Sequence, residues 1–133
     1  MSVLLDTHAL VWWAARSRLL SARAQTAIKH AATIYVSPVS CWEVARLHAR
    51  GRIALAAEPQ MWIRSLFGQD RVEVAPLSPS AAVAAADLAE DFPGDPVDRL
   101  LYGTAGDLRL PFVTRDRTIR SYAASHRDVR VIW

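Results

Sequence analysis

With 133 residues, 52% of them hydrophobic, the chain is large enough for one domain with a buried core, and we expect that domain to span residues 1–133. No apolar run approaches the roughly 18–20 residues that cross a bilayer, and an acid at position 6 argues against a signal peptide. The only cysteine, Cys41, has no partner for an internal disulfide, so we expect a cytoplasmic protein without a membrane segment. The net charge of +3 comes almost wholly from arginine, which suits phosphate contacts but by itself does not establish nucleic-acid binding.

Short apolar runs and helical patterns alternate along the chain. Strands are expected at residues 3–5, 34–37, 72–75, 112–114 and 129–133. Helices are expected just after Asp6 and at residues 21–28, 38–50, 61–67, 80–91, 97–110 and 116–125. Serine N-caps at Ser21 and Ser37 and a stop at Gly51 mark the clearest helix boundaries. The small side chains of the alanine-rich segment 80–91 would permit close packing of its helix.

This alternation predicts βαβ units, and hence an α/β fold with a mainly parallel sheet and helices on both faces. With right-handed crossovers, the carboxyl ends of the strands meet at one edge, where open α/β sheets bind their ligands. Asp6 directly follows the first strand and Asp116 closely follows the strand at 112–114, so we expect both at this edge. Glu43 and Asp98 lie in the first turns of helices, and they reach the same edge if those helices follow the same winding.

Each acid, taken singly, also has a purely structural explanation. Asp6, Asp95 and Asp116 can each cap the helix that follows. Asp98 would then lie in the first turn of its helix, where negative charge favours the helix dipole. Glu43 can pair with an arginine one or two turns farther along its own helix, a contact worth a few tenths of a kcal/mol.

As a set, Asp6, Glu43, Asp98 and Asp116 predict a metal site. Four carboxylates gathered at one edge repel one another strongly unless a cation lies among them. Ligands that are all oxygen favour Mg²⁺ or Mn²⁺ over Zn²⁺, and no histidine has a convincing ligand spacing. Such a metal can lower the pKa of a bound water and stabilise charge on a phosphoryl oxygen, so no side-chain nucleophile is required.

Four short stretches of the sequence occur in an order and at a spacing that are specific when taken together. They are Leu5-Asp6-Thr7-His8, Ser37-Pro38-Val39-Ser40-Cys41-Trp42-Glu43, Asp95-Pro96-Val97-Asp98-Arg99-Leu100-Leu101 and Val113-Thr114-Arg115-Asp116. The chain resembles the PIN-domain family through them, and within it the VapC-type toxins of bacterial toxin–antitoxin modules, over essentially its whole length. The resemblance implies a three-layer α/β/α sandwich with a mainly parallel central sheet, and a metal-dependent endoribonuclease that hydrolyses RNA.

The resemblance also implies roles for the four acids. Asp6 and Asp98 would hold the metal most directly. Glu43 and Asp116 would complete its shell through water and help to orient the attacking nucleophile. The expected cofactor is Mg²⁺ or Mn²⁺.

Five further residues are expected around the acids. Thr7 and Thr114 resemble polar supporting positions of the family. Asp95, three residues before the third acid, is expected as a cap or as a support behind the metal ligands. Among the arginines near the site, Arg46 and Arg99 are the first choices for contacts to RNA phosphates or to a carboxylate of an antitoxin.

Proteins of this family are usually dimers held in check by an antitoxin whose tail lies over the active-site groove. A homodimer and a VapB-like antitoxin are therefore expected partners, together with the RNA substrate. Trp12 and Trp13 are adjacent on a helix and point about 100° apart, which is typical of an interface if they are exposed. The alternative is that both tryptophans pack at the edge of one core.

Two other functions remain open. The same acidic site could belong to a structure-specific DNA nuclease, which competition between RNA and DNA substrates would reveal. A non-catalytic α/β module that binds RNA or protein would use its acids only as caps, and changing an acid to its amide would leave its function intact. A phospho-acceptor receiver domain is disfavoured because it would carry a lysine late in the chain, and the only lysine here is Lys29.

Overall fold

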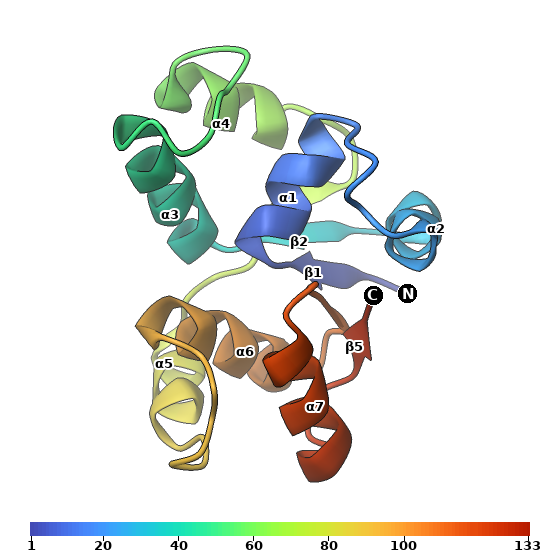
Figure 1. Ribbon diagram of the computed structural model, residues 1–133, viewed down its shortest axis with the longest axis vertical. Coiled ribbons are helices and arrows are strands. Elements are labelled where there is room, and N and C mark those ends of the chain that lie inside the picture. The colour runs from blue at the N-terminus through green and yellow to red at the C-terminus, as the bar shows by residue number, and fades with distance from the viewer.

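A five-stranded sheet forms the centre of the computed structural model, which describes residues 1–133 (Figure 1). Its strands are β1 (Val3–Leu5), β2 (Ile34–Val36), β3 (Val72–Val74), β4 (Phe112–Val113) and β5 (Val131–Ile132). They lie in the order β3-β2-β1-β4-β5, and every neighbouring pair is parallel. All three side chains of β1 are buried, because an uninterrupted apolar strand of this kind is covered on both faces. The prediction of a mainly parallel sheet is confirmed.

Seven helices connect the strands: α1 (Thr7–Ala14), α2 (Ala22–His30), α3 (Pro38–Ala49), α4 (Pro59–Phe67), α5 (Pro79–Ala86), α6 (Pro96–Leu108) and α7 (Arg117–His126). Two of them begin at the predicted serine caps. Ser21 Oγ accepts a hydrogen bond from the N–H of Ala24 at 3.1 Å, and Ser37 Oγ accepts one from the N–H of Val39 at 3.0 Å. Helix α6 is the longest at 13 residues, and none of the seven has the length and apolar character to cross a bilayer.

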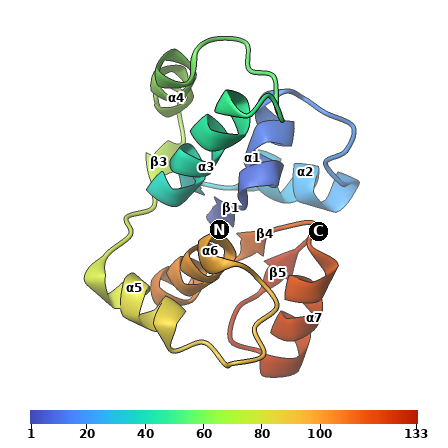
Figure 2. The same cartoon turned by 60° about the vertical axis from the view of Figure 1, so that its left-hand side comes forward.

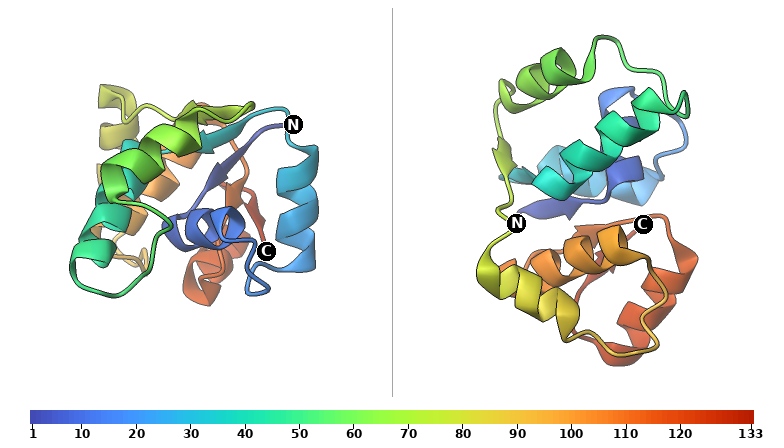
Figure 3. Two further views of the ribbon diagram at one scale, coloured as in Figure 1. Left: turned by 90° about the horizontal axis from the view of Figure 1, so that it is seen from above. Right: turned by 90° about the vertical axis from the view of Figure 1, so that its left-hand side faces the viewer.

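The helices form two layers, one on each side of the sheet (Figures 1 and 3). Helices α1 to α4 lie on one side, over a core that includes Leu5 and Val113. Helices α5 to α7 lie on the other side, over a core that includes Leu4 and Phe112. Successive residues of β1 and β4 thus point to opposite faces, as the two-residue period of a strand requires. This arrangement is the three-layer α/β/α sandwich that the resemblance implied.

Two adjacent tryptophans of α1 lie at the edge of the first core. Trp12 and Trp13 are both partly buried, and both pack against the apolar side chains between the sheet and helices α1 to α4. The alternative, that both tryptophans pack at the edge of one core, is therefore confirmed.

Helix α5 lies directly against α6, and a glycine makes this close approach possible (Figure 2). A Cβ atom on Gly103 would lie 2.7 Å from the Cα atom of Ala85, which is closer than side chains approach a backbone. The alanine-rich composition of α5 thus permits the close packing that the sequence predicted.

The end of α5 differs from its prediction. The helix stops at Ala86 rather than continuing to residue 91, because the chain turns there to bury Phe92 beside Tyr102, with ring centroids 5.1 Å apart. The Arg99 guanidinium donates hydrogen bonds to the carbonyl oxygens of Ala85 and Ala89 at 3.3 and 3.1 Å. The first bond satisfies a carbonyl group in the last turn of α5, and the second adds to the hydrogen bond that the Ala89 carbonyl accepts from the N–H of Phe92 at 3.0 Å.

Four strands are shorter than predicted, by one residue for β2, β3 and β4 and by three for β5. Ser37 caps α3 instead of extending β2. Thr114 follows β4; its N–H still donates to the Ile132 carbonyl at 3.3 Å, and its hydroxyl donates to Asp6. Trp133 lies just beyond β5, which covers only Val131–Ile132.

The winding of the sheet reverses between the central strand, β1, and its neighbour β4. From β1 the chain builds β2 and β3 on one side, and then crosses to build β4 and β5 on the other. A reversal of this kind opens a crevice at the carboxyl ends of the two strands that flank it. Leu5 pairs with Val113 at that end, so the residues that follow β1 and β4 emerge side by side.

Candidate active site

A cleft of about 790 Å³ opens where β1 and β4 end. Five carboxylates and three arginines face it, and we call it the acidic cleft. It is lined by Asp6, His8, Trp12, Glu43, Asp95, Asp98, Arg115, Asp116, Arg117, Thr118, Arg120 and Trp133. The fold therefore brings together the four acids that the sequence singled out, and it adds Asp95 to them.

Asp6 follows β1 directly and caps α1. The N–H of Thr7 donates to its Oδ1 at 2.7 Å, and the Thr114 hydroxyl donates to its Oδ2 at 2.6 Å. Burial raises the pKa of Asp6, and the negative charge of Asp116 adds to the rise, although both hydrogen bonds oppose it. Asp6 is thus a helix cap, and also a carboxylate that is costly to ionise as it stands.

Thr114 is a fully buried side chain that links two of the acids. Its Oγ1 donates to Asp6 and accepts a hydrogen bond from the N–H of Asp116 at 3.2 Å. Thr7 instead links two helices, because its Oγ1 on α1 donates a hydrogen bond to the Ser40 hydroxyl on α3 at 3.1 Å. Both threonines therefore contact the acids or the helices that carry them.

Asp95 and Asp98 form a reciprocal capping box at the start of α6. The N–H of Asp98 donates to Asp95 Oδ1 at 2.9 Å, and the N–H of Asp95 donates to Asp98 Oδ2 at 3.2 Å. Burial, together with the negative charges of Asp95 and Asp6, raises the pKa of Asp98 to about 7. A Cβ on Gly94 would collide with the Asp98 side chain and lie 2.7 Å from the Phe92 ring, so a glycine lets the chain pass this carboxylate.

Asp116 caps α7 and has the opposite electrostatic environment. Its Oδ1 accepts hydrogen bonds from the Thr118 hydroxyl at 2.6 Å, the Thr118 N–H at 2.9 Å and the Ile119 N–H at 3.0 Å. Burial pushes the pKa of Asp116 upward, but these hydrogen bonds and the charge of Arg120 outweigh it, so the pKa is lowered. Asp116 therefore stays ionised at pH values where Asp98 holds a proton, and two carboxyls of this kind suit different chemical tasks.

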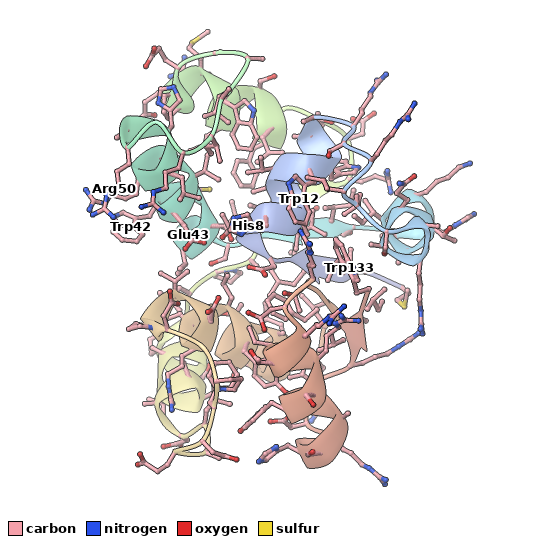
Figure 4. The ribbon with its side chains drawn as sticks, in the orientation of Figure 1. His8, Trp12, Trp42, Glu43, Arg50 and Trp133 are labelled. Carbon is pink, nitrogen blue, oxygen red and sulfur yellow. The ribbon has the colours of Figure 1, made fainter.

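Glu43 reaches the acidic cleft from the second turn of α3 (Figure 4). It is partly buried, and it forms no ion pair with Arg46 or Arg50, because the one ion pair in the structure joins His126 to Asp91. The explanation of Glu43 as half of a surface pair is therefore not realised.

The donor set of the cleft fits a hard divalent cation that keeps part of its water shell. None of the five carboxylates forms an ion pair, and Asp98 Oδ1 and Asp116 Oδ2 accept no hydrogen bond from the protein. No three acidic or histidine side chains converge into a closed metal cage as they stand. Mg²⁺ usually retains several waters and binds one or two carboxylates directly, so an open arrangement of oxygen ligands suits it and Mn²⁺ better than Zn²⁺.

The two arginines expected to contact RNA or an antitoxin do not line the cleft. The Arg46 guanidinium carbon lies 5.9 Å from the ring centre of Trp42, an exposed side chain on the outer face of α3. The Arg99 guanidinium donates to the carbonyl oxygens of Ala85, in the last turn of α5, and of Ala89, in the turn that follows it. The arginines that do line the cleft are Arg115, Arg117 and Arg120.

Sequence reasoning did not select Arg120 or Trp133. Arg120 lies four residues after Asp116 on α7, and this spacing places both on one helix face, so it could have been found. Trp133 reaches the cleft only because β5 pairs with β4, and no local pattern in the sequence carries that information.

Fold and site together define an α/β protein with a carboxylate centre at the switch point of a parallel sheet. The chain belongs to the PIN-domain family, whose model, described as "PIN domain", matches residues 3–125. The resemblance drawn from the four short stretches is thereby confirmed.

The family assignment also rests on a relative with high sequence identity. Ribonuclease VapC22 of Mycobacterium tuberculosis is 40% identical over 121 residues, which cover 91% of this chain and 92% of the relative. Similarity of this extent spans the two chains nearly from end to end, so it supports the same family independently of the family model.

Solved structures share the fold at low sequence identity. VapBC2 from Rickettsia felis, bound to a DNA fragment from their promoter, is 14% identical with a TM-score of 0.69, over 98% of this chain and 97% of that chain. VapBC-1 from nontypeable Haemophilus influenzae is 16% identical with a TM-score of 0.65, over 98% and 96%. The expected fold is confirmed by these likenesses.

Proposed function

We propose that residues 1–133 act as one PIN-like ribonuclease domain, an endoribonuclease that hydrolyses RNA phosphodiester bonds with Mg²⁺ or Mn²⁺. The observation that carries the proposal is the acidic cleft, in which hydrogen bonds hold Asp6, Asp98 and Asp116 at one edge of the sheet while none of them forms an ion pair. The 40% identity to a protein named Ribonuclease VapC22 supports RNA as the substrate.

We assign separate tasks to the acids. Asp6 and Asp98 would hold the metal, and Glu43 and Asp116 would complete its surroundings through water. When bound, the metal lowers the pKa of a water and stabilises charge on a phosphoryl oxygen. Asp116 has a lowered pKa, so it is ionised at neutral pH and can orient the attacking water by accepting a hydrogen bond from it. Thr114 keeps Asp6 and Asp116 in register through its shared hydroxyl.

Arginines of the cleft supply contacts to the phosphates on either side of the cleaved bond. Arg115, Arg117 and Arg120 stand beside the acids, and a guanidinium group suits phosphate oxygens. The Nε of Arg120 is buried without a hydrogen-bond partner, and such a donor gains most from an anion that reaches it. Contacts from Arg46 and Arg99 to RNA or an antitoxin stay predictions, since neither side chain lines the cleft.

We further propose that the protein is the toxin of a toxin–antitoxin pair, works as a homodimer and is inhibited by a VapB-like antitoxin. The similarity to VapC22 and the fold shared with VapBC complexes support this assignment. A cytoplasmic location goes with it, because Cys41, the only cysteine, needs no oxidising compartment.

The test is cleavage of total RNA by purified protein, freed from any antitoxin, with Mg²⁺ or Mn²⁺ and again with EDTA. We expect cleavage only with metal, and none from the Asp98→Asn variant, which excludes a contaminating nuclease. The amide oxygen that this substitution introduces can still accept the hydrogen bond from the Asp95 N–H, so the capping box and the fold should persist. Metal binding without cleavage of total RNA would call for a search for a narrower target, whereas the absence of both would end the proposal.

The capping hydrogen bonds support a second candidate, a non-catalytic α/β module that binds RNA or protein. Asp6, Asp95 and Asp116 each cap a helix, and these bonds alone give each residue a structural role. That candidate predicts that Mg²⁺ leaves the melting temperature unchanged and that Asp98→Asn leaves binding unchanged. Competition between RNA and DNA substrates separates the remaining alternative, a structure-specific DNA nuclease.

A further inference from the structure

Two indole rings are the only hydrophobic side chains in the lining of the acidic cleft. They belong to Trp12 and Trp133, whose ring centroids are 5.9 Å apart at an interplanar angle of 53°. Both are partly exposed, and in Figure 4 they lie near one another beside α1. Apolar rings in a cleft otherwise made of acids and arginines call for a chemical explanation.

Trp12, Trp133 and the neighbouring Arg115 come from three separate elements, and we call this part of the cleft the aromatic corner. Trp12 lies one turn after His8 on α1, with ring centroids 5.7 Å apart, and Trp133 follows β5. Arg115 follows β4, and its guanidinium carbon lies 5.4 Å from the ring centre of Trp12. Arg115 is exposed and forms no ion pair, so it is available to an anion beside the rings.

Cleavage of a phosphodiester by carboxylates and a metal does not itself require aromatic side chains. A nucleobase does suit them, because every base has a flat face that stacks on an indole, and one such contact changes affinity by about 5- to 150-fold. The Arg115 guanidinium lies over the Trp12 ring, and it suits the phosphate of the same nucleotide once the base has taken its place on that ring. Bases inside a duplex are already stacked and paired, so only an unpaired base can reach such rings.

We propose that Trp12 and Trp133 form a stacking platform for an unpaired RNA base next to the cleaved bond, and that Arg115 holds the adjacent phosphate. This assignment rests on the proposed function, and it deepens that function by naming the part of the substrate that this corner recognises. Trp12 and Trp133 are positioning residues here, while the carboxylates remain the residues of the chemical step.

The molecule contains a matched control for this platform. Trp42 on α3 also carries an arginine over its ring, Arg46, at 5.9 Å. Trp42 is 57% exposed, is absent from the lining of the cleft and extends from the outer side of α3 in Figure 4. It offers the same chemistry outside the site.

The experiment measures binding rather than cleavage. The probes are a short fluorescein-labelled oligouridylate and its abasic counterpart, which keeps the ribose-phosphate chain and lacks the bases. Fluorescence anisotropy in the Asp98→Asn background gives the two dissociation constants without turnover. We expect the base-bearing chain to bind at least about tenfold more tightly than the abasic chain, in line with one stacked base.

Substitutions in the platform should remove this preference for bases. Trp12→Ala and Trp133→Ala should each bring the two dissociation constants to within about threefold of each other, whereas Trp12→Phe should keep most of the preference because it retains an aromatic face. Trp42→Ala should leave the preference unchanged. Because Trp12 also packs on the core, the melting temperature of its variants is measured as well, and Trp133→Ala gives a second, independent variant.

Equal binding of both probes by the parent protein, no measurable binding of either, or an unchanged preference in both alanine variants would overturn the platform. Its failure is distinguishable from failure of the proposed function. If the wild type cleaves RNA and both Trp12→Ala and Trp133→Ala keep its KM for RNA, the platform is contradicted but the proposed function is not. If the protein cleaves no RNA but still binds the base-bearing probe more tightly, and this preference depends on the tryptophans, the nuclease assignment is contradicted but the platform is not.

Discussion

Two clefts of similar size in this molecule carry opposite charge. The acidic cleft measures about 790 Å³, and a second cleft of about 730 Å³ lies among α1, α2 and α4, with basic residues and no acid in its lining. We call the second one the basic cleft. Its cationic residues are Arg16, Arg18, Lys29 and Arg71.

The clefts differ in how their charged groups are held. In the acidic cleft, Asp6, Asp98 and Asp116 are fixed by hydrogen bonds, and their charges are kept together against repulsion. In the basic cleft only Arg71 is fixed, through hydrogen bonds to the carbonyl oxygens of Ile28 and Ala31 at 3.1 and 2.6 Å. The volume of a cleft therefore does not identify an active site. Like-charged side chains that hydrogen bonds hold close together do identify one.

The largest expected effect is on cleavage, from a substitution in the acidic cleft. Asp6→Asn leaves one oxygen to accept a hydrogen bond but removes the negative charge, so RNA cleavage should fall by about a thousandfold or more. Arg16→Ala in the basic cleft should change cleavage by no more than about twofold, because this exposed side chain has no fixed partner. Initial rates with excess Mg²⁺ measure both variants. Comparable losses would mean that the two clefts act together.

A smaller loss is expected when the link between two acids is cut. Thr114→Val removes the hydroxyl that donates to Asp6, which should lower cleavage by about 10- to 100-fold. Losing this bond raises the pKa of Asp6 further, so the pH at which activity appears should move upward. Thr104→Val is the control, since Thr104 is equally buried but bonds only to the Leu100 carbonyl of its own helix. Identical pH–rate profiles for the two variants would contradict this role of Thr114.

A glycine pair tests whether backbone packing positions Asp98. Gly94→Ala places a methyl group against Asp98 and the Phe92 ring, so it should cost about 1–3 kcal/mol of stability and also reduce cleavage. Gly106→Ala meets only Val129 at an ordinary 3.6 Å, and it should stabilise α6 by roughly 0.5–1 kcal/mol. Thermal unfolding and cleavage rates distinguish them, and a Gly94→Ala protein with full activity would show that Asp98 tolerates displacement.

The smallest effect is a pH-dependent difference in stability. The folded-state pKa of Asp98, about 7, lies above its ordinary value of 3.8, so between these pH values the folded protein holds a proton that the unfolded chain has released. Metal-free stability from this group is therefore greatest below about pH 4 and declines as pH rises to 7. Partial exposure of Asp98 limits the decline to roughly 1–2 kcal/mol.

Denaturant unfolding of the wild type and Asp98→Asn at about pH 5 and pH 8 measures this difference. The wild type should lose stability relative to the variant at the higher pH. Mg²⁺ should restore stability to the wild type there by mass action and do little at the lower pH, where a proton occupies the site. If the difference in unfolding free energy between the wild type and Asp98→Asn does not change with pH, the raised pKa of Asp98 is contradicted.

Local features of this protein could be predicted from its sequence. The apolar run at Val3–Leu5 predicted a buried parallel strand, and the serines at 21 and 37 predicted helix starts, because side-chain period and capping act over a few residues. The acids Asp6 and Asp116 could be placed at one edge because parallel strands with right-handed crossovers leave little choice of topology. Glu43 and Asp98 could be placed at the same edge if their helices follow the same winding, and the resemblance to the family singled out the same four acids.

Other features were decided only by the tertiary structure. The hydrogen bond from Thr114 to Asp6 joins residues 108 positions apart, and Trp133 enters the cleft through the pairing of β5 with β4. Arg99 looked like a ligand for phosphate in the sequence, but its guanidinium donates to two carbonyl groups, one in the last turn of α5 and one in the turn that follows it. These placements depend on which distant segments pack together, and that is settled by burial of the whole core, whereas caps and strand patterns are settled by the few residues that form them.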